Sequence, residues 1–197
     1  MKNRLVRNLL GLTLAASATF SLLSLSGCVP IVAGGVGAGI LMAEDRRTPG
    51  TYLIDQEIEL KAGSKIRENV GESTHVNVTS YNRRVLLTGE APNAEIRAKV
   101  EELARAAPNV RDVQNELTIG EVSSFTSRTS DTYITTKVKT RFLDDKRFNF
   151  HHVKVVTEAG TVFLMGVVKR EEGNAAGEIA ARTGGVQKVV KVFDYMD

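Results

Sequence analysis

One structural unit occurs twice in this sequence, and the repeat constrains the fold more than any other feature. The runs at residues 80–91 (SYNRRVLLTGEA) and 157–168 (TEAGTVFLMGVV) both place a polar turn before a short apolar segment that contains a glycine near its end. Valines alternate with polar residues before each run. Alternation, a turn and an apolar run predict a β-hairpin with one buried face in each copy.

The alignment extends well beyond the hairpins. At a constant offset His75 aligns with His152 and Gly89 with Gly166, and Asp55 aligns with Asp131 after a one-residue gap. A unit of roughly seventy residues is close to the smallest that buries a core of its own, whereas a solenoid needs at least three copies. The repeat therefore predicts two small domains in tandem.

Each copy predicts two helices and about three strands. In the first copy, Asp55 is expected to cap a helix whose apolar stripe runs from Ile58 to Ile66 at intervals of four. A second helix is expected at residues 94–107 and a returning strand at residues 110–119. Because each element has one apolar face, we expect an α+β fold in which two helices pack on one face of a small mixed sheet in each domain.

These patterns also place the domain boundaries. The first domain is expected at residues 55–120 and the second at residues 131–197, with a linker rich in serine and threonine at residues 121–130. Gly173 and Gly177 fall in the predicted last helix. Glycine is unfavourable in a helix interior, so either this helix is weak or the sheet comes close to it.

The N-terminal segment predicts a bacterial lipoprotein signal. Three basic residues precede an uncharged apolar run at residues 9–25, which leads into Leu-Ser-Gly-Cys ending at Cys28. A basic start, a short apolar core and small residues before the cut are typical of secretory signals. A membrane-spanning helix or a buried free cysteine is the alternative, but the run is short for a span. We therefore expect residues 1–27 to be removed and Cys28 to be lipidated.

Residues 28–54 are then expected to form the lipid anchor and tether. The residue after Cys28 is Val29 and not aspartate, which predicts sorting to the outer membrane with the protein facing the periplasm. The uncharged segment 29–43 either lies against the membrane or is a flexible tether, since it is too short to span alone. A single cysteine excludes a disulfide framework, so the domains must depend on their cores.

Charge separates the two domains slightly. Three of the 26 basic residues leave with the signal, so the mature chain carries 23 basic and 23 acidic residues. This balance gives no general attraction to nucleic acid. Residues 55–120 hold nine basic and eleven acidic residues, and residues 131–197 hold eleven basic and nine acidic ones. The second domain is therefore the better candidate for meeting an anionic surface.

The first helix of the second domain, expected at residues 131–143, carries the candidate contact residues. Ile134, Val138 and Phe142 form its core stripe. The candidates occupy its other faces: Tyr133, Lys137, Lys139, Thr140, Arg141 and Leu143. Cations beside aromatic and aliphatic side chains suit a lipid interface. A solvated basic face is the alternative interpretation.

Three stretches resemble the BON domain, a bacterial module named for osmotically induced and nodulation-associated proteins. They are residues 130–140 (SDTYITTKVKT), 153–166 (VKVVTEAGTVFLMG) and 85–95 (VLLTGEAPNAE). With the lipidation motif and two copies, nearly all of the mature chain is similar to outer-membrane lipoproteins that have two BON domains. The resemblance implies a role in envelope integrity at the division septum.

The resemblance also implies a ligand. In such proteins the second domain binds anionic phospholipid, such as phosphatidylglycerol and cardiolipin, chiefly through its first helix, and the first domain packs against it. Tyr133 stands where relatives have tryptophan, so it offers less apolar area. Asp144 and Asp145 follow Leu143 directly, and their charge opposes contact with phosphates. The competing hypothesis is an interaction scaffold for outer-membrane assembly or cell-wall remodelling proteins.

Catalysis, cofactors and metals are not expected. The chain has three histidines, of which His151 and His152 are adjacent and His75 aligns with His152. The sequence shows no serine elbow, phosphate loop or metal-ligand spacing. The sequence therefore predicts a binding protein with no enzymatic function.

Overall fold

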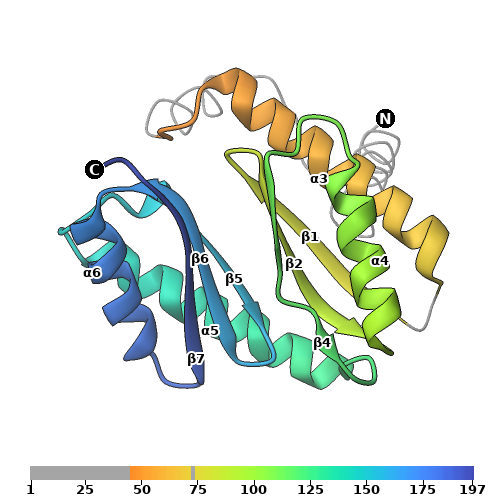
Figure 1. Ribbon diagram of the computed structural model, residues 1–197. Helices are drawn as coiled ribbons and strands as arrows, with labels where there is room; N and C mark the ends of the chain where they lie inside the picture. The colour runs from red at the N-terminus through yellow and green to blue at the C-terminus, as the bar shows by residue number, and fades with distance from the viewer. Residues whose placement is uncertain (1–44, 72–73) are drawn as a thin grey trace, which may run out of the picture. The chain divides into compact units, whose positions relative to one another are not determined.

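The computed structural model describes residues 45–71 and 74–197 (Figure 1). The expected signal (1–27), the lipidation site Cys28 and most of the tether lie outside the described residues. Within the described residues, no helix combines the length and the hydropathy needed to cross a membrane.

The first domain has two helices and a four-stranded sheet. In chain order its elements are α3 (Pro49–Val70), β1 (His75–Tyr81), β2 (Arg84–Ala91), α4 (Ala94–Arg105), β3 (Asp112–Asn115) and β4 (Thr118–Ile119). Strand β1 pairs antiparallel with β2, and both β3 and β4 pair parallel with β2. The strand expected at residues 110–119 is therefore interrupted at residues 116–117, where Leu117 is buried in the core although Glu116 N still donates to the carbonyl of Leu87 at 2.9 Å.

The second domain repeats this plan with a three-stranded sheet. Its elements are α5 (Phe125–Asp144), the 3₁₀ turn η2 (Phe150–His152), β5 (Val153–Glu158), β6 (Thr161–Val168), α6 (Arg170–Ala181) and β7 (Lys188–Tyr195). Strand β5 pairs antiparallel with β6, and β7 pairs parallel with β6. Two mixed sheets with two helices each confirm the predicted α+β class.

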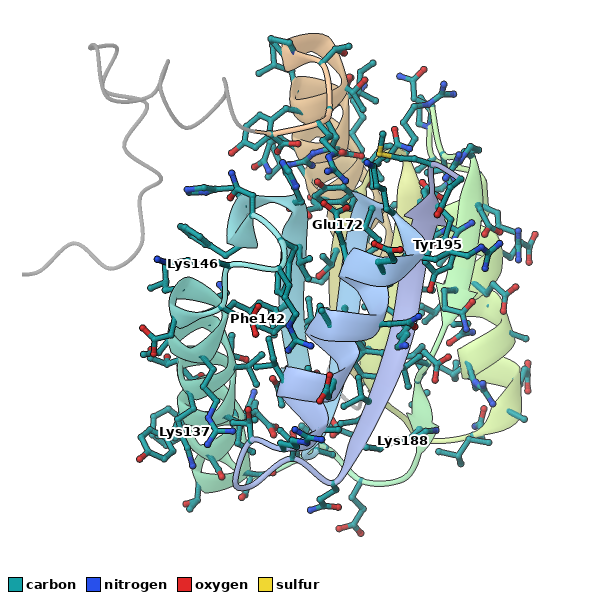
Figure 2. The ribbon with its side chains drawn as sticks, turned by 90° about the vertical axis from the view of Figure 1, so that its left-hand side faces the viewer. Lys137, Phe142, Lys146, Glu172, Lys188 and Tyr195 are labelled. Carbon is teal, nitrogen blue, oxygen red and sulfur yellow. The ribbon has the colours of Figure 1, made fainter. Side chains whose placement is uncertain are left out.

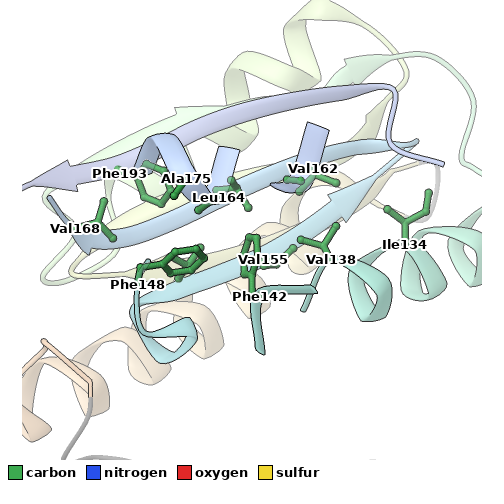
Figure 3. Packing of buried hydrophobic residues seen from close by; sticks show 13 residues of the cluster. Ile134, Val138, Phe142, Phe148, Val155, Val162, Leu164, Val168, Ala175 and Phe193 are labelled. Carbon is green, nitrogen blue, oxygen red and sulfur yellow. The ribbon is translucent and has the colours of Figure 1, made fainter. Parts of the chain in front are cut away.

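In each domain the core lies between the two helices and one face of the sheet. The predicted stripe of α5, Ile134, Val138 and Phe142, packs there against β5, β6 and α6 (Figure 3). Phe142 meets Phe148 edge to face, with ring centroids 5.1 Å apart. In the first domain Ile58 and Ile66 of α3 fill the corresponding place. Each helix is thus held by burial of its apolar stripe.

Asp55 does not cap its helix, contrary to expectation. Helix α3 begins six residues earlier, with Thr48 as its N-cap. Asp55 lies within the helical segment, and its side chain is fully buried. It accepts hydrogen bonds from the backbone N–H groups of Asn82 (2.8 Å) and Arg83 (2.7 Å). Both of these turn residues have positive φ, the conformation of the tightest hairpin turns. Asp55 therefore fixes the β1–β2 turn.

The second domain uses the same device. Asp131 of α5 is buried and accepts hydrogen bonds from the N–H groups of Ala159 (2.9 Å) and Gly160 (2.8 Å), which form the β5–β6 turn with positive φ. The repeat of the aspartate along the chain thus reflects a repeated contact between helix and hairpin.

The expected linker of residues 121–130 is helical from Phe125 onward. Ser124 caps α5, since its side chain accepts a hydrogen bond from Ser127 N at 3.2 Å. The serines and threonines that suggested a linker instead form the N-cap and first turns of the helix, a role that their hydroxyls suit.

Glycines in α6 allow the sheet to come close, which decides between the two interpretations of this helix. A Cβ at Gly173 would lie 3.0 Å from the ring of Phe193, and one at Gly177 would lie 2.5 Å from Lys191 Cε. Both neighbours belong to β7. A larger residue at Gly177 requires the Lys191 side chain to move.

The second faces of the two sheets share a further apolar cluster. Leu86 of the first domain packs with Phe163, Met165 and Val192 of the second, and Tyr81 completes the group. Polar contacts join the domains around it. For example, Lys154 Nζ donates to Glu59 Oε1 at 2.8 Å, and Arg46 donates twice to Glu172, at 2.6 and 2.7 Å.

Candidate functional site

Helix α5 carries all six residues that the sequence singled out for lipid contact. Tyr133, Lys139, Thr140, Arg141 and Leu143 are exposed, and Lys137 is exposed only in part, because it lies against a neighbouring loop. Figure 2 shows Lys137 projecting from the outside of α5, whereas Phe142 turns inward. The buried stripe pins the helix to the sheet and so sets which of its residues face solvent.

Opposite the buried stripe, α5 has a second stripe that combines threonines with apolar side chains. We call it the outer stripe. Its members follow one another at intervals of three or four residues, the spacing of one helix face: Phe125, Thr129, Thr132, Thr136, Thr140 and Leu143. Each of the four threonine hydroxyls donates to the carbonyl four residues earlier, at 2.9 to 3.0 Å. Because these hydroxyls bond within the helix, removing water from this stripe costs little.

Large apolar side chains lie exposed at both ends of the outer stripe. Phe125 is 81% exposed and Leu143 is 57% exposed, while Tyr133, beside the stripe, is 65% exposed. Sequence analysis missed Phe125 because that residue was assigned to the linker. The spacing of Phe125 from Thr129 and Thr132 is the signal that would have placed it on the helix.

Cations flank the outer stripe on both sides, as the rotation of about 100° per residue requires. Lys137 and Arg141 lie on one flank, and Lys139 and Arg128 lie on the other. The six expected residues therefore do not form one cluster. They divide between two flanks and the stripe between them.

The flank of Lys137 is tied to the end of α6. Lys137 Nζ donates to the carbonyl of Gly184 at 2.6 Å and lies 5.2 Å from the ring centroid of Tyr133. Arg141 donates to the carbonyl of Arg182 at 2.7 Å. Carbonyls at a helix C-terminus attract cations. Part of the positive charge on this flank is therefore already engaged within the protein.

The opposite flank borders a groove of about 480 Å³. Lys139 and Leu143 lie at it together with aromatic side chains from both domains, among them Tyr52, Tyr81 and Phe150. Lys154 also lines the groove. The lining thus combines apolar walls with ammonium groups, an arrangement that suits a ligand with an apolar part and a negative charge.

The acidic residues after Leu143 are partly neutralised. Arg147 forms an ion pair with Asp145 at 2.8 Å and another with Glu178 at 2.9 Å. Hydrogen bonds from Arg147 hold the pKa of the Asp145 carboxyl below its usual range. Of the two aspartates that were expected to oppose phosphate contact, Asp145 thus has a guanidinium beside it.

A second group of titratable side chains lies where the two sheets meet, beside a pocket that Arg128 and Asp131 of α5 also line. It consists of His75, Glu90 and Glu158. Burial raises the pKa of the Glu158 carboxyl, against the lowering effect of a hydrogen bond from Asn77. The sequence did not predict that these three residues lie close together, because Glu158 belongs to the second domain and the other two belong to the first.

Comparisons with known proteins identify the repeated unit. The family model of the BON domain matches residues 54–121 and 130–196. The outer membrane lipoprotein DolP of Haemophilus influenzae is 39% identical over 175 residues, which cover 88% of this chain and 91% of the relative. A protein named 21 kDa hemolysin from Actinobacillus pleuropneumoniae is 34% identical over 154 residues, 77% of this chain and 79% of the relative. The osmotically-inducible protein Y of Escherichia coli is 27% identical over 145 residues, 71% of this chain and 72% of the relative.

Proposed function

Because this chain belongs to the BON-domain family and is an outer-membrane lipoprotein with two such domains, we propose that it binds anionic phospholipid through helix α5. Phosphatidylglycerol and cardiolipin are the proposed ligands, and Cys28 is the proposed lipid attachment site. Through this contact the protein is recruited to membrane rich in these lipids, such as the division septum, and helps to maintain outer-membrane integrity.

The outer stripe with its flanking cations is the observation that carries the proposal. A helix that lies in a membrane interface inserts an apolar face and keeps cations at the level of the phosphates. Phe125, Leu143 and the internally bonded threonines supply the low-polarity face. Lys139 and Arg128 on one flank, with Lys137 and Arg141 on the other, supply the positive charge. Each cation near an anionic surface contributes about 1 kcal/mol.

The groove beside Lys139 extends this surface. Lys139 places an ammonium group next to the apolar side chains of Leu143 and Phe150. A phospholipid carries a phosphate next to acyl chains. In the groove, the ammonium group of Lys139 would meet the phosphate, and the neighbouring apolar side chains would meet the acyl chains. We therefore include Lys139 and Leu143 in the contact, in addition to Tyr133, Thr140 and the Lys137 flank.

Reversing the charge of Lys139 is expected to weaken binding to anionic vesicles. Lys139→Glu changes the charge beside the phosphates by two units, which corresponds to about 2 kcal/mol, or roughly a thirtyfold loss in the partition coefficient. The measurement is sedimentation of unlipidated residues 44–197 with phosphatidylcholine vesicles that contain phosphatidylglycerol. Pure phosphatidylcholine vesicles provide the neutral comparison.

Lys65→Glu is the matched control, because Lys65 is an exposed lysine on α3 and its reversal changes the net charge equally. This variant should lose far less affinity than Lys139→Glu. Equal losses would mean that net charge alone drives binding. Absence of binding to anionic vesicles by the unaltered protein would refute lipid recognition and would favour the scaffold hypothesis, in which an envelope protein is the partner.

A further inference from the structure

Three potential metal ligands converge where the two sheets meet. His75 begins β1 and Glu90 lies directly opposite it on β2, while Glu158 ends β5 in the other domain. One ligand atom from each residue lies within 4.8 Å of the other two. His75 Nδ1 and Glu90 Oε2 are 3.1 Å apart. Ligands bound to one zinc ion at about 2.0–2.1 Å lie roughly 3.3 Å from each other, so this pair already has suitable spacing.

The backbone around the group is firmly held. Asp131 fixes the turn that follows Glu158, and Asn77 Nδ2 donates to Glu158 Oε2 at 2.9 Å, which orients the carboxylate. On the opposite side, the β1–β2 ladder sets the positions of His75 and Glu90. Contacts of this kind around the ligands favour metal binding, because they restrict the movement of the ligands.

The two carboxylates of the group are buried and short of positive charge. Glu90 is 6% exposed and Glu158 is 8% exposed, and buried carboxylates need a cation or a metal ion nearby. Within the group only His75 can carry a positive charge. The buried Thr88 hydroxyl lies near the Glu158 carboxyl and acts to lower its pKa, against the rise that burial causes.

The grouping is not a consequence of the shared fold. The position of Glu90 corresponds to Val167 in the second repeat, and the position of Glu158 corresponds to Tyr81 in the first. Near these equivalent positions the charged side chain is a lysine and not a carboxylate: Lys154 Nζ donates to the carbonyl of Ser80, which precedes Tyr81, at 3.3 Å. The carboxylates therefore occur at one of two equivalent places only.

We propose that His75, Glu90 and Glu158 bind a divalent transition metal ion that links the two domains, with zinc as the probe. One imidazole nitrogen and two carboxylate oxygens suit zinc, with a fourth position left for water. Magnesium and calcium prefer oxygen ligands alone. A pocket of about 220 Å³, lined in part by His75, Glu158 and Arg128, gives the ion a path from solvent. Because ligands come from both domains, the bound ion holds the sheets together.

Zinc titration of residues 44–197 by calorimetry tests the proposal, because this segment contains every described contact and lacks Cys28. We expect a single site per chain that binds zinc and not magnesium, with amide shifts at both Glu90 and Glu158 in NMR spectra. Glu158→Gln keeps an acceptor for Asn77 and should weaken zinc binding about a hundredfold. His75→Gln, in the other domain, should give a similar loss.

His151→Gln is the control for adventitious binding, because His151 and His152 are adjacent and lie outside the group. It should leave the zinc affinity unchanged. Unchanged affinity in both Glu158→Gln and His75→Gln, or loss of binding in His151→Gln alone, would overturn the proposal. So would an unaltered protein that binds no zinc, since Arg128 or protonation would then balance the two carboxylates.

Discussion

Replacing Asp55 by alanine is expected to lower the free energy of unfolding by about 3–5 kcal/mol, the range for removing one partner of a buried ion pair. Asp55 is fully buried and accepts from Ser80 Oγ (2.7 Å), from the N–H groups of Asn82 and Arg83, and from Arg47 (2.8 Å). Its loss leaves a buried guanidinium and two turn amides without this acceptor. Urea unfolding followed by circular dichroism measures the effect.

The second domain provides the comparison. Asp131→Ala removes the same two turn bonds, but no arginine pairs with Asp131 among the described contacts, and its turn contains a glycine at a positive-φ position. We expect a smaller loss, about 2 kcal/mol. Asp112→Ala, at a half-exposed position, should cost less than about 1 kcal/mol. Equal losses at Asp55 and Asp131 would show that Arg47 and the strained turn residues contribute little.

Gly89→Ala is expected to destabilise the protein by more than about 3 kcal/mol, because two separate costs combine. Gly89 has φ of +113°, a backbone conformation that residues other than glycine rarely adopt. A Cβ there would also approach the carbonyl oxygen of His75 to 2.0 Å. That oxygen belongs to the neighbouring strand, so the β1–β2 ladder would have to shift. Thermal and urea unfolding measure the loss.

Two other glycines separate these costs. Gly71 has φ of +73°, and no atom of the described residues lies within 4 Å of the place that a Cβ would take. A Cβ at Gly166 would instead lie 2.3 Å from the carbonyl oxygen of His152, without a positive φ. Gly71→Ala thus reports strain and Gly166→Ala reports the close approach, and each should cost less than Gly89→Ala.

Gly120→Ala is the control for this series, because Gly120 has neither a positive φ nor a close neighbour in the described part of the chain. It should be nearly neutral. A tolerated Gly89→Ala would contradict the close pairing of β1 with β2.

The candidate surface on α5 was predictable in part. Tyr133, Lys137 and Leu143 were assigned to a helix, and the burial of Ile134, Val138 and Phe142 fixed which sides remain exposed. The length of the helix was not predictable in the same way, because serine and threonine serve equally as linker residues and as helix N-caps. Phe125 was missed for this reason.

The features that the sequence predicted depend on local interactions, whereas those that only the tertiary structure showed depend on contacts between residues far apart in the chain. Periodic apolar residues and the repeat determined the two α+β domains, since a helix or strand must bury its apolar face wherever it packs. Only the tertiary structure showed that Asp55 bonds a hairpin turn 27 residues away, that Lys139 and Leu143 border a groove, and that Glu158 meets His75. Such contacts depend on how separate elements pack, and the local periodicity of a sequence does not predict that packing.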